Sequence, residues 1–238
     1  MNDSGPVFSH GARSRLTPYD LHLFASDSLF DRMARAVCAA GCLPRKELYE
    51  AWEVARRTRR RFRGGRVLDM AGGHGLLAQV MLLLDDSSPS ALVVDRVIPS
   101  SAGKVAEVLT REWPRLRGRV TLVEGEVAAV AIDASDVVVS SHACGALTDV
   151  ILERAVAAHA RVAVLPCCHD FDAADAKRLG GWVDGALSIE VARAHRLEAR
   201  GYRIWTQTIP TGITSKARLL LGEPDPKVGP TSSRSTCG

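Results

Sequence analysis

Several features that would assign this chain to a common class of protein are scarce or missing. No apolar run approaches the roughly 18 residues that a membrane-spanning helix requires, and no apolar signal segment precedes the cysteines. Aromatic residues make up 5% of the chain, which leaves few rings for stacking single-stranded nucleic acid. The six cysteines are unevenly spaced and do not outline a disulfide framework. We therefore expect a soluble protein in a reduced, cytoplasmic setting, with no membrane partner.

Apolar residues make up 46% of the 238 residues, enough for the core of one α/β domain with additions. The net charge is +4, and basic residues are concentrated in the stretch ARRTRRRFRGGR, which contains Arg56, Arg57, Arg59, Arg60, Arg61, Arg63 and Arg66. This cluster is either a patch for RNA phosphates or the solvated C-terminal face of a helix. The sequence leaves both interpretations open.

The first 63 residues predict an arm followed by a helical cap. Residues 1–16 are rich in Ser, Gly and Arg and predict a mobile arm. Thr17 and Pro18 are typical of a helix start, and apolar residues at helical spacing continue as far as Gly41. One helix is therefore expected over residues 17–41, and a second over residues 43–62.

Short apolar runs alternate with helix-length segments through the rest of the chain. The runs are RVLDM, ALVVD, RVTLVEG, DVVVSS and RVAVLP, then, after one or two helices over residues 173–200, YRIWTQTIP and KARLLLGE. Continuous apolar strands separated by helices are typical of a parallel sheet covered on both faces. We predict an α/β fold: a doubly wound, Rossmann-like sheet of seven mostly parallel strands over residues 64–222. Residues 223–238 are expected to form a disordered tail.

The first strand-to-helix turn, VLDMAGGHGLLA, concentrates glycine where a ligand would approach the start of a helix. Gly73-x-Gly75-x-x-Ala78 fits the dinucleotide fingerprint, and Asp95 ends the next strand, so a nicotinamide-dependent oxidoreductase is one hypothesis. Asp69 argues against it, because a carboxylate at this strand end would repel a pyrophosphate. A carboxylate suits a cationic ligand such as S-adenosylmethionine, which carries an ammonium and a sulfonium group.

VLDMAGGHG also resembles the first motif of class I methyltransferases, D-x-G-x-G-x-G, with Ala71 in place of the first glycine. Alanine fits many turn positions without a positive φ, so we expect an ordinary backbone at Ala71. Asp95 would then hold the ribose hydroxyls, and Glu124 or Glu126 would meet the adenine amine. The resemblance implies that S-adenosylmethionine is bound by Asp69, Ala71, Gly73, Gly75, Asp95 and Glu126.

Two later strands end in histidine and cysteine. DVVVSS runs into His142 and Cys144, and RVAVLP runs into Cys167, Cys168 and His169. If the two strands are neighbours in a parallel sheet, both ends open on the cofactor side, where ligands of such sheets bind. Convergence of reactive side chains at that edge predicts a reaction site.

HACGALTD and PCCH together resemble motifs of a methyltransferase-domain family that includes eukaryotic tRNA 2′-O-methyltransferases and uncharacterised bacterial and animal proteins. The resemblance spans residues 65–222, includes the weaker match GITSKARLLL, and implies methyl transfer. The chain departs from the tRNA enzymes at three points: it has no preceding zinc module, Ser141 replaces a lysine, and Asp170 replaces a second histidine. The resemblance therefore supports methyl transfer better than a tRNA acceptor. Its motif residues are His142, Cys144, Gly145, Thr148, Asp149, Cys167, Cys168 and His169.

These side chains have several possible roles. We expect no metal, because adjacent Cys167 and Cys168 should point to opposite sides, as successive strand residues do. Covalent attack by a cysteine needs a lowered thiol pKa and a partner acid, neither of which the sequence shows. Direct transfer to oxygen or nitrogen needs a positioned acceptor and a base, for which His142 is the first candidate and His169 the second. Cys144 is the third catalytic candidate, with lining of the cofactor site as its alternative role.

The sequence thus predicts a methyltransferase that uses S-adenosylmethionine and acts on RNA or a small molecule. The Asn/Asp-Pro-Pro-aromatic signature of many base and amide N-methyltransferases is absent, which weakens that class. Two alternatives stay open: the nicotinamide-dependent oxidoreductase, and a non-catalytic module that holds RNA through Arg56, Arg57, Arg59, Arg60, Arg61 and Arg63.

Overall fold

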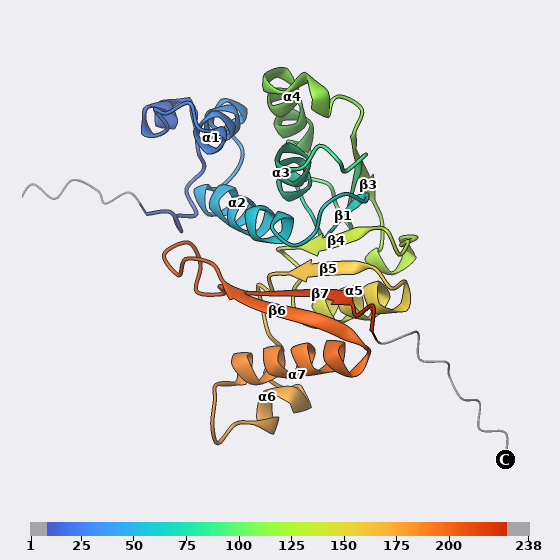
Figure 1. Ribbon diagram of the computed structural model, residues 1–238. Coiled ribbons are helices and arrows are strands. Elements are labelled where there is room, and N and C mark those ends of the chain that lie inside the picture. Colours follow the sequence, from blue (N-terminus) through green and yellow to red (C-terminus); the bar gives the residue numbers. More distant parts are fainter. Residues whose placement is uncertain (1–8, 228–238) are drawn as a thin grey trace, which may run out of the picture.

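The computed structural model describes residues 9–227 and places seven strands in one sheet (Figure 1). The strands are β1 (Val67–Met70), β2 (Ala91–Asp95), β3 (Val120–Glu124), β4 (Val137–Ser140), β5 (Arg161–Val164), β6 (Tyr202–Thr208) and β7 (Arg218–Pro224). Their order in the sheet is β3-β2-β1-β4-β5-β7-β6. β7 runs antiparallel to both β5 and β6, and the first five strands pair in parallel. The predicted doubly wound, mostly parallel sheet is confirmed.

Helices cover both faces of the sheet (Figure 1). They are α1 (Leu29–Ala40), α2 (Arg45–Arg59), α3 (Leu76–Leu84) and α4 (Ala102–Glu112) on one side, and α5 (Ala146–Ala157), α6 (Ala174–Arg178) and α7 (Gly185–Ala199) on the other. In β4, Val137 and Val139 pack into the core that contains residues of α1–α4, whereas Val138 packs into the core beneath α5 and α7. Two-sided burial explains why the strands read as unbroken apolar runs. Within residues 9–227, the structure contains no helix of the length and apolar character needed to cross a membrane.

The N-terminal segment differs from the prediction in two ways. Instead of one helix over residues 17–41, there is a short 3₁₀ helix, η1 (Pro18–Leu23), followed by α1. The break arises because Ser28 caps α1, its hydroxyl accepting a hydrogen bond from the Asp31 amide at 3.1 Å. The predicted mobile arm is also wrong at its end, since Leu16 is fully buried and its amide donates to the Leu43 carbonyl at 2.9 Å. Residues 1–8 lie outside the described residues.

The C-terminal third places two helices before the last two strands, as expected. β7 includes the first two residues of the segment predicted to be a tail, and the Asp225 amide donates to the Gly201 carbonyl at 2.8 Å. The rest of the predicted tail, residues 228–238, lies outside the described residues.

Arg59 is a structural residue rather than part of a surface patch. Its side chain is 2% exposed and lies 3.2 Å from the buried Asp85 carboxylate. It also donates to the Met81 and Phe62 carbonyls and to the Ser88 hydroxyl. Burial lowers the pKa of Arg59 to about 10, although Asp85 opposes that shift. The prediction that Arg59 binds RNA phosphates is wrong, because its donors are used inside the protein.

We expect Arg59→Met to destabilise the domain by about 3–5 kcal/mol, because it removes the closer and buried cation of Asp85, which keeps only the 3.7 Å contact with the exposed Arg63, and leaves three buried acceptors without their donor. The matched control is Arg60→Met at the exposed next position, which should change stability by less than about 0.5 kcal/mol. Urea denaturation of both variants measures the difference. Equal stabilities would contradict the structural role of Arg59.

Candidate active site

The loop between β1 and α3 is held in a tight left-handed conformation. Ala71, Gly73 and Gly75 have φ values of +57°, +51° and +71°. The expectation of an ordinary backbone at Ala71 is therefore wrong: the turn requires a positive φ there, which costs alanine more than glycine. A Cβ added to Gly73 would meet no atom within 4 Å, so this part of the loop borders open space. One added to Gly75 would lie 2.9 Å from Val93, which fixes the loop against β2.

Asp69 lies beneath this loop and is fully buried. Its Oδ2 accepts a hydrogen bond from the Ala78 amide of α3 at 3.1 Å, whereas Oδ1 has no hydrogen-bond partner among the described residues. A Cβ on Gly72 would approach the Asp69 carboxyl carbon to 2.7 Å, so the loop covers the carboxyl group directly. Burial raises the pKa of Asp69 to about 7; the Ala78 amide lowers it, while the charges of Asp95 and Glu47 raise it further.

Asp95, at the end of β2, is tied to the same loop. Its Oδ2 accepts a hydrogen bond from the Gly73 amide at 2.9 Å. Glu124 accepts from the Ile98 amide at 3.0 Å. Glu126 follows β3 with 62% of its side chain exposed and pairs with Arg96. The structure thus brings Asp69, Asp95 and Gly73 together. Glu126 lies close in sequence to the end of β3, with most of its side chain exposed to solvent.

His74 also anchors the loop, which the sequence did not predict. Its Nε2 lies 2.9 Å from the Ser101 hydroxyl, next to α4, and its Nδ1 lies 3.6 Å from Glu47 of α2. The signal available in the sequence was a histidine inside the glycine motif itself. These contacts connect the helical cap to the glycine loop between β1 and α3.

The loop after β4 contains two of the catalytic candidates. His142 is half-buried and Cys144 is exposed. Asp149, expected either to cap α5 or to orient a loop, pairs with Arg193 of α7 at 2.7 Å, and Arg193 donates to the Gly145 carbonyl at 3.0 Å. These contacts fit the role of orienting a loop rather than that of capping α5. Arg193, which the sequence analysis missed, lies in a helix more than 40 residues further along the chain and only folding brings it close.

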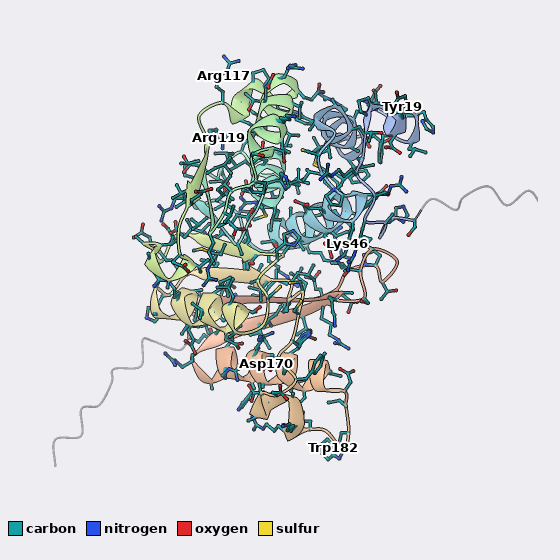
Figure 2. The ribbon with its side chains drawn as sticks, turned by 180° about the vertical axis from the view of Figure 1, so that it is seen from behind. Tyr19, Lys46, Arg117, Arg119, Asp170 and Trp182 are labelled. Carbon is teal, nitrogen blue, oxygen red and sulfur yellow. The ribbon has the colours of Figure 1, made fainter. Side chains whose placement is uncertain are left out.

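The loop after β5 directs His169 away from solvent. Its side chain is 1% exposed, and Nε2 lies 2.8 Å from Glu190 of α7, another residue that the sequence did not single out. Nδ1 is buried and has no partner within residues 9–227. Burial lowers the pKa of His169, and Glu190 opposes that shift. Asp170, which replaces the second histidine of the motif, is exposed (Figure 2).

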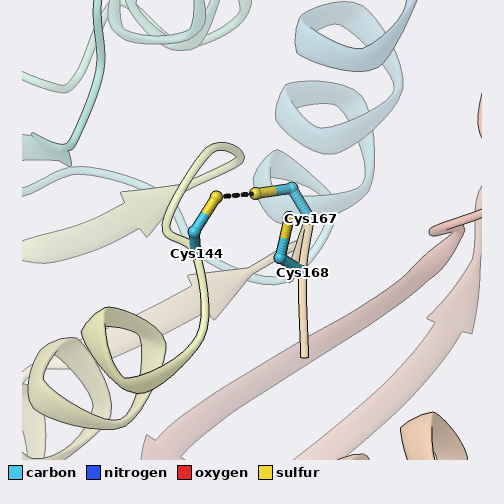
Figure 3. Close-up of side chains that lie close together, drawn as sticks. All are labelled: Cys144, Cys167 and Cys168. Carbon is cyan, nitrogen blue, oxygen red and sulfur yellow. Dashed lines mark hydrogen bonds between the residues drawn. The ribbon is translucent and has the colours of Figure 1, made fainter. Parts of the chain in front are cut away.

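The three cysteines of these loops lie together (Figure 3). The sulfurs of Cys144, Cys167 and Cys168 are all within 4.8 Å of one another, and those of Cys144 and Cys167 are 2.8 Å apart. The expectation that adjacent cysteines cannot reach one point is wrong, because Cys167 and Cys168 follow the end of β5 and lack the alternation of a strand. Burial and the neighbouring thiols raise the pKa of Cys167, and burial raises that of Cys144.

The remaining residues of the arginine cluster do not form a continuous free patch. Arg56 and Arg57 pair with Glu53 on the same helix. Arg61 is exposed but lies over the ring of Trp205, 4.9 Å from its centroid. Arg60 and Arg63 are exposed as well.

The end of this cluster lies at the edge of the sheet where the strands begin. Arg161, the first residue of β5, donates to the Arg63 carbonyl at 2.6 Å. Cys167 and Cys168 follow the last residue of the same strand. The exposed end of the cluster is therefore separated by the length of a strand from the histidine and cysteine loops.

A family model described as "Methyltransferase domain" matches residues 46–171, more than half of the chain, including the glycine loop and both histidine and cysteine loops. This chain belongs to that methyltransferase-domain family. No curated protein sequence matches it.

Solved structures of other proteins resemble this domain. An O-methyltransferase family protein from Burkholderia thailandensis superposes with a TM-score of 0.51 and 17% identity, covering 88% of this chain and 63% of that chain. The M1A22 tRNA methyltransferase TrmK of B. subtilis gives a TM-score of 0.49 and 15% identity, covering 74% of this chain and 65% of that chain. This methyltransferase domain thus spans just under two thirds of each of these proteins. The likeness to the Burkholderia protein is one of fold.

We expect Asp69→Asn to change how the stability of the methyltransferase domain depends on pH. The pKa of Asp69 is about 7 in the folded protein, against an ordinary value of 3.8. Between these values the unfolded chain loses this proton before the folded one does, so wild-type stability falls as pH rises, by at most about 1.4 kcal/mol per pH unit. The variant lacks this loss, and the difference should be visible in urea denaturation from pH 4.5 to pH 8 (roughly the window that the two pKa values define). Parallel pH profiles would show that Asp69 is ionised in the fold.

Proposed function

We propose that this methyltransferase domain uses S-adenosylmethionine and transfers its methyl group to an oxygen or nitrogen of an acceptor held at the carboxyl edge of the sheet. The observation that carries the proposal is the buried Asp69 carboxyl group, which has one unpartnered oxygen beneath a glycine loop that borders open space. When bound, S-adenosylmethionine supplies a methyl group on a positively charged sulfur. The residues of the loop fit such a group by charge and by shape.

The charge of Asp69 separates this cofactor from a dinucleotide. A carboxylate buried in a medium of low dielectric interacts strongly with nearby charges, so it favours a cationic ligand and disfavours a pyrophosphate. Asp95 supplies a second carboxylate at the end of β2, already oriented by the Gly73 amide, for the ribose hydroxyls. Glu126 is the candidate for the adenine amine. Membership of the methyltransferase family supports the same choice over a nicotinamide cofactor.

On the acceptor side, His142 is the proposed base. It follows the end of β4, is half-buried and lies in the loop that Asp149 and Arg193 orient. A base in this position removes the acceptor proton as the methyl group is transferred. His169 is held by Glu190 in a buried site, which supports a positioning role for it.

The contacts of the arginine cluster do not favour RNA as the acceptor. Its buried member and its two Glu53-paired members are occupied within the protein, and its exposed end lies near the start of β5. A small-molecule acceptor needs none of these arginines.

The deciding experiment is calorimetric titration with S-adenosylhomocysteine and, separately, with NAD. One-to-one binding of S-adenosylhomocysteine alone supports the proposal, and labelled methyl transfer to total RNA and to small metabolites then identifies the acceptor. Binding of NAD alone would support the hypothesis of a nicotinamide-dependent oxidoreductase instead. Salt-sensitive RNA binding that survives Asp95→Ala, with no methyl transfer, would indicate the non-catalytic module.

We expect Asp69→Asn to weaken S-adenosylmethionine binding by about 10- to 100-fold, the range of a lost charge-assisted interaction. Because the pKa of Asp69 is about 7, wild-type affinity should fall as pH drops from 8 to 6 and the carboxylate becomes protonated, while the variant shows no such dependence. Calorimetry at several pH values measures both effects. Asp27→Asn, at a fully exposed position, is the matched control. Unchanged affinity in Asp69→Asn would remove the charge argument.

We expect His142→Ala to keep cofactor affinity and to lower turnover by about 10²- to 10⁴-fold, the contribution of a general base. His195→Ala, at an exposed position on α7, should leave turnover unchanged. Single-turnover methyl transfer with the identified acceptor tests both variants. Turnover near the wild-type rate in His142→Ala would exclude His142 as the base.

A further inference from the structure

The cysteine cluster is a feature that the proposed methyl transfer does not require. We propose that Cys144, Cys167 and Cys168 form a binding site for one thiophilic metal ion, Zn²⁺ or Cu⁺, with a coordination position open to solvent. Three thiols from two separate loops meet at one point of the surface (Figure 3). Thiolate ligands select these two ions over the harder cations that oxygen ligands bind.

The backbone holds the two loops in register. β4 and β5 pair in parallel up to Ser140 and Val164, so the loops leave the sheet side by side. Beyond the strands, Cys144 and Cys168 form an isolated parallel bridge, and the Gly145 amide donates to the Cys168 carbonyl at 3.4 Å. The sulfur positions therefore depend on the backbone of both loops.

Hydrogen bonds to backbone carbonyls orient two of the thiols. Cys167 donates to the carbonyls of His142 and Ala143 at 3.4 and 3.6 Å, and Cys144 lies 3.6 Å from the His142 carbonyl. Preorganised ligands lose less conformational entropy when an ion binds.

The sulfur separations suit one ion after a small adjustment. A Zn–S bond is about 2.3 Å long, so two thiolates on a tetrahedral ion lie about 3.8 Å apart. All three sulfurs are within 4.8 Å of one another, and the Cys144–Cys167 pair, at 2.8 Å, must open by about 1 Å to reach that tetrahedral spacing. Side-chain rotation of the exposed Cys144 allows this opening. Each coordinating thiol releases its proton to solvent.

Three protein ligands that solvent can reach correspond to a metal site with one coordination position left for water or substrate. Cys144 and Cys168 are exposed and Cys167 is half-buried. Among residues 9–227, no histidine, cysteine or carboxylate joins these three cysteines in the group whose ligand atoms all lie within 4.8 Å of one another. His169 is engaged by Glu190. Zinc sites with three protein ligands keep the remaining position for water or substrate, whereas structural sites are closed by four.

A disulfide is the competing fate of these residues, since two of the sulfurs are close. A disulfide uses two thiols, however, and would not require the third within the same 4.8 Å. The arrangement of three favours an ion.

The test uses the full-length protein, stripped of metal by a chelator and kept reduced by a phosphine under anaerobic conditions. Zn²⁺ and Cu⁺ are titrated separately against a chromophoric chelator specific for each ion. We expect one equivalent of at least one of them to bind. The Cys144→Ser, Cys167→Ser and Cys168→Ser variants should each weaken binding by more than the 10- to 100-fold that loss of an outer-shell partner costs. The control is Cys42→Ser, whose thiol lies 4.0 Å from the Ser101 carbonyl and should leave binding unchanged.

Substitution with Cd²⁺ gives a readout that does not depend on the variants folding. The thiolate-to-metal charge-transfer absorption should rise linearly and stop at one equivalent, with an intensity that corresponds to three thiolates. Lack of stoichiometric binding, or binding that persists in all three serine variants, would overturn the proposal. Because neither titration needs a methyl donor, this result and the S-adenosylhomocysteine result are independent of each other.

Discussion

The parallel pairing of β4 with both β1 and β5 is the constraint on which the candidate site depends. Parallel strands in one sheet end at the same edge, so the loops that follow them are brought together whatever their sequences. Asp69 in β1, His142 after β4 and Cys167 after β5 share an edge for this reason. The strands are buried on both faces, and a shift of one residue would move Val138 into the opposite core, which keeps the register fixed.

Burial of ionisable groups is the second organising feature. Arg59, Asp69 and His169 are all nearly or fully inaccessible, but their hydrogen bonding differs. Arg59 has its charge partner in Asp85 and three further acceptors, which is the pattern of a structural ion pair. Asp69 keeps an oxygen without a partner among the described residues, and such groups are rare in stable cores unless a ligand or solvent completes them. The hydrogen-bond partners of the two side chains, rather than their burial, therefore distinguish the structural Arg59 from the candidate Asp69.

The helical cap contributes to the site indirectly. Glu47 of α2 lies 3.6 Å from His74, and its charge also acts on Asp69. α2 therefore connects the helical cap to the glycine loop at one end and, through Arg59, to the segment around Asp85 at the other. The methyltransferase family match begins at residue 46, next to the start of α2, and so includes this helix.

The period of the apolar residues and the positions of glycine were enough to predict the sheet, its mostly parallel strands and the loop after β1, because these are local patterns that two-sided burial imposes.

The same local reasoning failed where distant residues decide the outcome. It placed Arg59 on a positively charged surface, whereas Arg59 is buried, paired with Asp85 and hydrogen-bonded to the Met81 carbonyl of α3. It predicted divergent thiols for Cys167 and Cys168, which a loop rather than a strand brings to Cys144. Glu190 and Arg193 had no local signal at all. Local sequence patterns thus set which elements form and which residue types end them. The contacts between those residues depend on the folded arrangement, because side-chain partners come from elements far apart in the chain and the free energy of burying a charge depends on those partners.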